Sequence, residues 1–431
     1  MTLETTNPTK RWLTTLACAL VIGAVQGCGG GGGGGGGSSS EPQPSQTVVE
    51  QQPIELITES PTQPTASTPT TSGSTNTNTG STTGTTTSPE TPQQSVTEEA
   101  NYNETDPNLG QGMLQLIGIN VAGAEFTSSQ LPGVHNTHYF FPKEGYFDKW
   151  KLKGVRSVRF PIKWERLQPT LNGEFDPTYA GLIDTMFTQA TQADMDIILD
   201  VHNYAKYRGN PIGSAEVPFA AYQNLMERIV KRWGNRSSLY AYDIMNEPNG
   251  KADAYWAEAA QYGINGVRKY DRQRPIYIEG MSYASAARWP KTSNELLKLV
   301  DPVDNIVFSA HIYLDSNASG QLYSTDTGPV DPMVGVKRAT PFVNWLKTNG
   351  KRGQIGESGI PDDPVYLEAM DNLLAYLQQN CIPMTYWAAG RAWGNYTLSI
   401  EPNKDGTDKA QWKLLEKYVG KGNCADYGPN S

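Results

Sequence analysis

Short apolar runs alternate with longer amphipathic stretches from about residue 110 onward. This alternation predicts strands separated by helices, as in a parallel α/β domain. The predicted strands cover residues 116–123, 155–161, 195–202, 239–247, 275–280, 305–313, 352–358 and 382–388. The predicted helices between them include residues 176–193, 216–233, 253–270, 333–349 and 364–380.

Eight strands with intervening helices in roughly 310 residues predict a (β/α)8 TIM barrel. A doubly wound sheet of eight strands is the structural alternative. No Gly-rich phosphate-binding turn follows the first predicted strand, so the barrel is favoured. In a barrel, the active site is built at the carboxyl ends of the strands.

The stretch before the barrel has a different composition. A run of nine glycines after Cys28 leads into Ser-, Thr-, Pro- and Gln-rich sequence without apolar periodicity. Such a segment cannot offset its ordering entropy, so residues 29–108 are predicted to be a disordered linker to a catalytic barrel at 109–431.

An export signal is predicted at residues 1–28. Lys10 and Arg11 precede the apolar run WLTTLACALVIGAV, which is too short to span a bilayer. The run ends at Val-Gln-Gly-Cys, which resembles a bacterial lipobox with Cys28 as the lipidated residue. Ordinary secretion with cleavage nearby is the alternative.

The net charge and the cysteine content limit which partners and bound groups the protein is expected to have. The net charge of −9 argues against a nucleic-acid partner, which requires clustered Lys and Arg. Cys381 and Cys424 are the cysteines left after the N-terminal ones are assigned, and in an oxidising compartment they are candidates for a disulfide. With four cysteines and four histidines in the chain, no metal site is expected.

Polar residues gather where the predicted strands end. These residues are Arg159, His202, Asn246, Glu247, His311, Tyr313, Glu357 and Trp387. Any one of them alone would be an ordinary solvated loop residue. Together they contain two glutamates, two histidines, an arginine and two aromatic rings at the edge where a barrel forms its site.

Two carboxyl groups facing each other across a cleft suit glycoside hydrolysis. One must be protonated at rest to act as an acid, and the other must be ionised to attack the anomeric carbon. Tyr313 and Arg159 are candidates to hold the ionised carboxylate, and Trp387 offers a flat face for a sugar ring. Glu279, also at a strand end, is a rival carboxylate without a neighbouring Asn or His in sequence.

The chain resembles glycoside hydrolase family 5 over about residues 112–420. The motifs that carry the resemblance are GINVAGAEF, VRFPIKW, LDVHNYAKY, YDIMNEPNG, HIYLDSNASG, IGESGIP and YWAAGRAWG. The resemblance implies a retaining mechanism with Glu247 as acid/base and Glu357 as nucleophile. It also implies supporting or substrate-binding roles for Arg159, His202, Asn203, Asn246, His311, Tyr313 and Trp387.

Within the family, HNYAKYRG and HIYLDSNASG look most like the endo-β-1,4-glucanase branch. The expected protein is therefore a cellulase that needs no cofactor and acts on β-glucan as a monomer. It is expected to be secreted or to be anchored to the bacterial cell envelope, at the outer membrane. The lipid on Cys28 would then be its only contact with the membrane. A β-mannanase, a mixed-linkage β-glucanase and a non-catalytic carbohydrate-binding lipoprotein are the alternatives.

Overall fold

The computed structural model describes residues 115–420, 424 and 426–429. The predicted signal peptide at 1–28, the lipidation of Cys28 and the predicted linker at 29–108 lie outside the described residues. Within the part that is described, no helix combines the length and the apolar character needed to cross a membrane.

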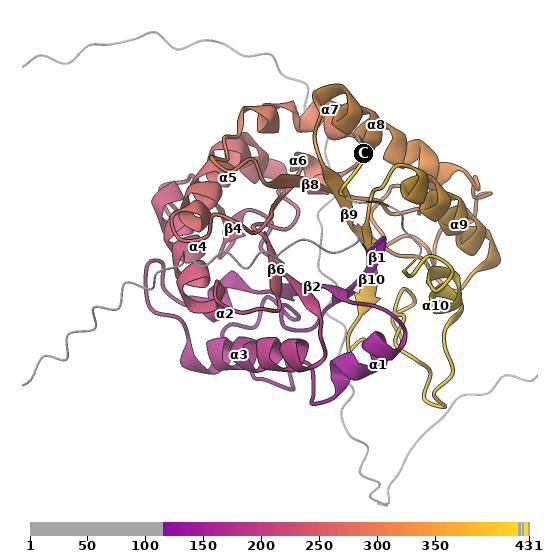
Figure 1. Ribbon diagram of the computed structural model, residues 1–431, viewed down its shortest axis with the longest axis horizontal. Coiled ribbons are helices and arrows are strands. Elements are labelled where there is room, and N and C mark those ends of the chain that lie inside the picture. Colours follow the sequence, from indigo (N-terminus) through magenta and orange to yellow (C-terminus); the bar gives the residue numbers. More distant parts are fainter. Residues whose placement is uncertain (1–114, 421–423, 425, 430–431) are drawn as a thin grey trace, which may run out of the picture. The chain divides into compact units, whose positions relative to one another are not determined.

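Eight parallel strands close into a barrel (Figure 1). They are β1 (Ile117–Val121), β2 (Ser157–Ile162), β3 (Asp196–Val201), β6 (Leu239–Asp243), β7 (Ile276–Glu279), β8 (Ile306–His311), β9 (Gly353–Ser358) and β10 (Met384–Ala389). The first strand pairs with the last, with Ile117 opposite Met384. This closure confirms the predicted barrel and excludes the doubly wound sheet, which keeps two open edges.

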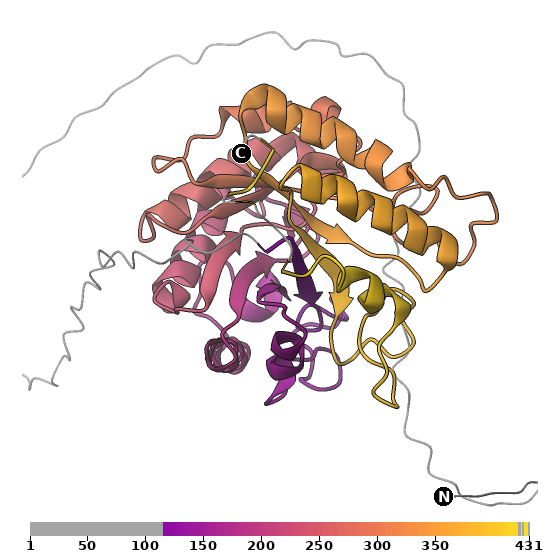
Figure 2. The same cartoon turned by 45° about the vertical axis from the view of Figure 1, so that its right-hand side comes forward.

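Helices surround the barrel (Figure 1). The five predicted ones are α3 (Pro177–Gln192), α4 (Phe219–Trp233), α5 (Asp253–Arg268), α8 (Val334–Asn349) and α9 (Pro364–Gln379). Shorter elements that were not predicted are α1 (Tyr146–Leu152), α2 (Trp164–Leu167), α6 (Met281–Ala284), α7 (Trp289–Thr292), α10 (Ala410–Leu415), the 3₁₀ turns η1 (Gly250–Ala252) and η2 (Asn294–Lys298), and a hairpin of β4 (Lys206–Tyr207) and β5 (Asn210–Pro211). Figure 2 shows α8 and α9, the long orange and gold helices, side by side on the outer surface.

Local sequence explains where the long helices begin and which face they bury. The α3 and α9 helices each start with Asp-Pro: Asp176 accepts a hydrogen bond from the Tyr179 N–H, and Asp363 accepts one from the Val365 N–H. Proline at the first helical position loses no hydrogen bond there. Along α4, residues spaced three or four apart are buried, which turns one stripe of the helix toward the barrel.

The predicted strand at 239–247 ends four residues early. β6 stops at Asp243, and the chain reaches Glu247 as a loop in which Glu247 has φ of 43°, in the left-handed region. Pro248 follows and restricts the backbone of the residue before it. The turn therefore sets the direction in which the Glu247 side chain leaves the barrel.

The C-terminal tail is attached to the end of the barrel opposite the strand carboxyl ends. Cys381, which precedes β10, forms a disulfide with Cys424, with an S–S distance of 2.03 Å. Beyond it, the Tyr427 hydroxyl lies 2.5 Å from that of Tyr277 and 2.8 Å from that of Tyr240, and its ring packs with Ile198, Ala241, Tyr277 and Val307. Tyr427 thereby packs across the amino-terminal end of the barrel.

Candidate active site

The polar side chains predicted at the strand ends form one hydrogen-bonded network at the carboxyl-terminal opening of the barrel. Arg159, on β2, lies at its centre and is fully buried. Its guanidinium donates from Nε to Asp243 (2.7 Å), from Nη1 to Glu357 (2.9 Å) and Asn120 (3.0 Å), and from Nη2 to Asn246 (2.8 Å) and Glu279 (2.8 Å), with Asp200 at 3.0 Å. A rigid planar fork with five N–H groups suits this task, and a lysine could not replace it.

Sequence reasoning missed Asp200 and Asp243, on β3 and β6. Both are fully buried, and each leaves its Oδ1 atom without a hydrogen-bond partner among the described residues. Burial raises the pKa of Asp243 to about 7, with Glu279 adding to the shift and Arg159 opposing it. Burial also raises the pKa of Asp200 well above its ordinary value, although Arg159 opposes this shift. The available signal was an acidic residue inside an otherwise apolar strand.

His202 connects this buried layer to Asn246 and Trp387. Its Nδ1 donates to Asp200 Oδ2 at 2.7 Å, and its Nε2 accepts from Asn246 Nδ2 at 3.2 Å. Burial lowers the pKa of His202 well below its usual value, so the ring is neutral, as this pattern of one donor and one acceptor requires. The half-buried Trp387 ring stacks on it, with centroids 5.6 Å apart and planes 17° apart.

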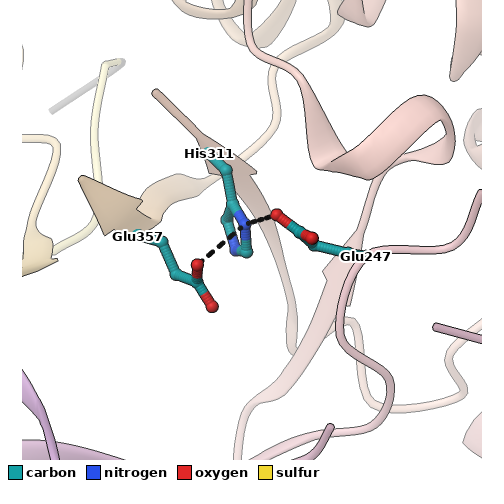
Figure 3. Close-up of side chains that lie close together, drawn as sticks. All are labelled: Glu247, His311 and Glu357. Atoms are coloured by element: carbon teal, nitrogen blue, oxygen red, sulfur yellow. Dashed lines mark hydrogen bonds and ion pairs between the residues drawn. The ribbon is translucent and has the colours of Figure 1, made fainter. Parts of the chain in front are cut away.

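Glu247 and Glu357 approach each other from opposite sides of His311 (Figure 3). Each of the three offers a side-chain atom within 4.8 Å of the others. Glu357 is nearly buried, and its two oxygens accept hydrogen bonds from Arg159 Nη1 and the Tyr313 hydroxyl, both at 2.9 Å. Glu247 has 14% of its side chain exposed and accepts from His311 Nδ1 at 2.8 Å. The two carboxyl groups therefore have different environments.

His311 has a carboxylate at each ring nitrogen. Nδ1 contacts Glu247, and Nε2 lies 3.1 Å from Glu279 Oε1. Burial lowers the pKa of His311, but the charges of Glu279 and Glu357 and the two hydrogen bonds outweigh burial and raise it well above the ordinary value. The ring is therefore protonated and donates from both nitrogens. Among the described residues, Glu247, His311 and Glu357 are the one group whose spacing would suit a metal ion, and both ring nitrogens of His311 are already engaged by Glu247 and Glu279.

Two predicted positions have unexpected contacts. Asn203 is fully engaged: it accepts from the Trp164 N–H and donates both amide hydrogens, to Glu165 and to the Lys206 carbonyl. It therefore ties the chain after β3 to α2 and to the β4–β5 hairpin. Glu279, considered a rival carboxylate, is fully buried within the network and presents no oxygen to solvent.

Comparisons with known proteins agree with this geometry. A family model described as cellulase (glycosyl hydrolase family 5) matches residues 119–392. Endo-beta-1,4-glucanase B of Emericella nidulans is 31% identical over 307 residues, which cover 70% of this chain and 91% of that protein. The probable endo-beta-1,4-glucanase B of Neosartorya fischeri is 32% identical over 321 residues, 73% of this chain and 94% of that protein.

Solved structures give the same result. The endoglucanase Cel5A of Pseudomonas stutzeri, in complex with cellobiose, is 39% identical with a TM-score of 0.71, covering 74% of this chain and 98% of that one. An endo-beta-1,4-glucanase of Xanthomonas axonopodis pv. citri is 36% identical with a TM-score of 0.67, covering 71% of this chain and 98% of that one. With the family model matching more than half of its length, this chain belongs to glycosyl hydrolase family 5 and is a glycoside hydrolase.

Proposed function

We propose that this protein is a retaining endo-β-1,4-glucanase in which Glu357 is the nucleophile and Glu247 the acid/base. The observation that carries the proposal is the spacing of these carboxyl groups, whose nearest oxygens lie within 4.8 Å. Retaining enzymes hold their carboxyls about 5–5.5 Å apart, whereas inverting enzymes separate them by roughly 6.5–9.5 Å to admit a water molecule. The relatives that are named endo-beta-1,4-glucanase support a β-1,4-glucosidic bond as the bond that is cleaved.

The environments of the two carboxyls support the assignment of roles. Glu357 accepts from Arg159 and Tyr313, and these donors stabilise a carboxylate, the form that attacks the anomeric carbon. Glu247 is the more exposed of the two and shares a proton-bearing contact with His311. In the first step, a Glu357 oxygen bonds to the anomeric carbon while Glu247 protonates the departing glycosidic oxygen. In the second, Glu247 removes a proton from water, whose oxygen attacks the same carbon and releases Glu357.

Two further residues are proposed to hold the sugar between these carboxyls. Asn246 uses its Oδ1 for Arg159 and one amide hydrogen for His202, which leaves its second amide hydrogen for a sugar hydroxyl. Trp387, held parallel to His202, offers its other face to a pyranose ring. The related Pseudomonas stutzeri enzyme has been crystallised with cellobiose, which fits a β-1,4-linked glucose chain as the substrate class.

The test of the substrate is reducing-sugar release by the purified protein on several polysaccharides. We expect cleavage of carboxymethyl cellulose, with a rapid fall in viscosity that marks internal cutting. Barley mixed-linkage glucan, glucomannan, galactomannan and xylan form the rest of the panel. Activity confined to a mannan would keep the two carboxylate roles and change the substrate. No release from any glycan would instead favour a carbohydrate-binding protein on the same barrel.

We also propose that the barrel, at residues 109–431, is exported as a monomer and tethered by the linker at 29–108 through a lipid on Cys28. The support is the basic and apolar N-terminal sequence and the lipobox-like Val-Gln-Gly-Cys. In a bacterial host grown with an alkyne-tagged fatty acid, we expect the full chain to be labelled and to fractionate with membranes. The Cys28→Ala variant should lose the label, and labelling that persists in it would refute the anchor.

A further inference from the structure

The Glu279 carboxylate contacts Glu247 directly and is linked to Glu357 through Arg159, without being one of the catalytic pair. Its Oε2 accepts the backbone N–H of Glu247 at 2.6 Å. Its Oε1 accepts from Arg159 Nη2 at 2.8 Å and from His311 Nε2 at 3.1 Å. Arg159 in turn holds Glu357, and His311 holds the Glu247 carboxyl group. One buried carboxylate thus connects the acid/base and the nucleophile by short paths.

We propose that Glu279 is a positioning residue that holds Glu247 in its proton-donating geometry, through its backbone and through His311. The inference rests on the proposed acid/base role of Glu247. Both carboxylate oxygens of Glu279 are already engaged by the Glu247 N–H, Arg159 and His311, so it has none left for a substrate hydroxyl.

The backbone of Glu247 explains why such a partner is needed. A φ of 43° places a non-glycine residue in the left-handed region, which costs about 1–2 kcal/mol and persists only when its surroundings impose it. Glu279 binds the N–H of Glu247, and Asn249 Nδ2 donates to its carbonyl at 2.9 Å. The peptide groups on both sides of the Glu247 side chain are therefore fixed.

Glu279 is rigid enough to serve as this support. It is the last residue of β7, and its backbone carbonyl accepts from Trp256 Nε1 at 2.7 Å. All of its carboxylate contacts are charge-assisted or made to a backbone N–H, which are the stronger classes of hydrogen bond. A small displacement of this carboxylate would move the Glu247 peptide and the His311 ring together.

The same carboxylate also affects how tightly the Glu247–His311 pair holds its proton. A negative charge beside a titrating pair favours the protonated form, so its removal lowers proton affinity. The charge of Glu279 comes first among the groups that raise the pKa of His311 against the effect of burial. The titratable and charged groups around the Glu247–His311 pair are Glu279, Glu357, Arg159, Asp200, Asp243, His202, Tyr204, Tyr283 and Tyr313.

The experiment compares the full-length wild type with Glu279→Gln on two substrates of different leaving-group quality. Cellopentaose has a sugar leaving group that needs a proton, whereas dinitrophenyl β-cellobioside has one that leaves without it. We expect kcat on cellopentaose to fall on the order of 10²-fold, the cost of a misplaced catalytic group. On the aryl substrate, the rate constant of the first, bond-breaking step should fall less than about tenfold.

The pH profile supplies a readout that a merely structural role would not move. In Glu279→Gln, the alkaline limb of kcat/KM should shift to lower pH, by on the order of one unit, because the pair loses its proton more readily. Glu279→Asp keeps the charge but shortens the side chain, so it should keep the alkaline limb while still losing activity on cellopentaose. If circular dichroism shows that Glu279→Gln does not fold, the activities of Glu279→Asp on the same two substrates test the proposal instead.

Asp301→Asn is the matched control, because Asp301 is a buried carboxylate paired with Arg268 at 2.7 Å, in the loop before β8 and away from the strand carboxyl ends. It should lower Tm without changing the pH profile or the ratio of the two substrates. Equal losses on both substrates in the Glu279 variants, with an unmoved alkaline limb, would overturn the inference while leaving the proposed function intact. A wild type inactive on cellopentaose would instead contradict the proposed function.

Discussion

Replacing Glu357 with glutamine is expected to abolish turnover, with kcat on carboxymethyl cellulose falling on the order of 10⁴- to 10⁶-fold. This loss corresponds to about 5–8 kcal/mol of transition-state stabilisation. A neutral amide cannot form the covalent glycosyl intermediate, so no other part of the site substitutes for the missing step. The measurement is steady-state reducing-sugar release at saturating substrate, with the unfolding temperature recorded alongside.

Glutamine is the informative substitution at this position. It keeps the size of the side chain and one oxygen, which can still accept from Arg159 or Tyr313. The fold should therefore survive, and cellopentaose should still bind with a Kd within about tenfold of that of the wild type, measured by calorimetry. Retained binding would separate a lost nucleophile from a collapsed site.

Covalent trapping identifies the nucleophile directly. A fluorinated aryl β-cellobioside that forms the intermediate but hydrolyses slowly should add one cellobiosyl group to the wild type and none to Glu357→Gln. Peptide mass spectrometry should locate the group in the peptide that contains IGES. A label on Glu247 or Glu279 would show that the roles have been assigned to the wrong carboxyls.

Replacing Glu247 with glutamine is expected to have an effect that depends on the leaving group. On polysaccharide, kcat should fall about 10²- to 10⁴-fold, the usual contribution of general acid–base catalysis. On dinitrophenyl β-cellobioside, the first step needs no proton and should proceed at nearly the wild-type rate. The second step still needs a base to activate water, so the glycosyl-enzyme should accumulate and appear as a burst of released dinitrophenol.

Azide provides the matching test of the second step. It is an anionic nucleophile that needs no general base, and it should restore turnover of the aryl substrate by the Glu247→Gln variant. The product should be the β-glycosyl azide, because two inversions retain the configuration. Failure of azide to increase the rate, or formation of the α-azide, would contradict the acid/base role. Glu357→Gln, tested in parallel, should form no β-azide.

The sequence by itself determined the order of the elements. Strands of four to six residues with buried side chains and helices with a buried stripe are local patterns, and all eight predicted strands are the strands of the barrel. Each catalytic candidate could be placed at a strand end for the same reason. Since the carboxyl ends of barrel strands meet at one opening, this local reading was enough to bring Glu247 and Glu357 together.

Predictions from short stretches of sequence fail to distinguish residues that have the same type and the same position at a strand end. Glu247 and Glu279 both stand at the end of a predicted apolar strand, yet the Glu247 side chain is 14% exposed and Glu279 is fully buried. The difference has two causes. Glu247 lies in a left-handed turn, and Glu279 on β7 is bound by Arg159, which comes from the distant strand β2. Neither cause can be recognised from a few neighbouring residues in the sequence. Asn203 follows His202 in sequence, but its hydrogen bonds go to α2 and β4 and not to the network around Arg159.

The tertiary structure alone decided the chemistry of the buried charges. Arg159 collects carboxylates from β3, β6, β7 and β9, and these lie as many as 198 residues from Arg159 in sequence. Whether a given carboxyl group is ionised, protonated or only positions another depends on which partners closure of the barrel brings within about 3 Å and on how much water it excludes. Local sequence periodicity places a side chain at a strand end, but its partners there come from strands distant in sequence, and these partners determine what the side chain can do.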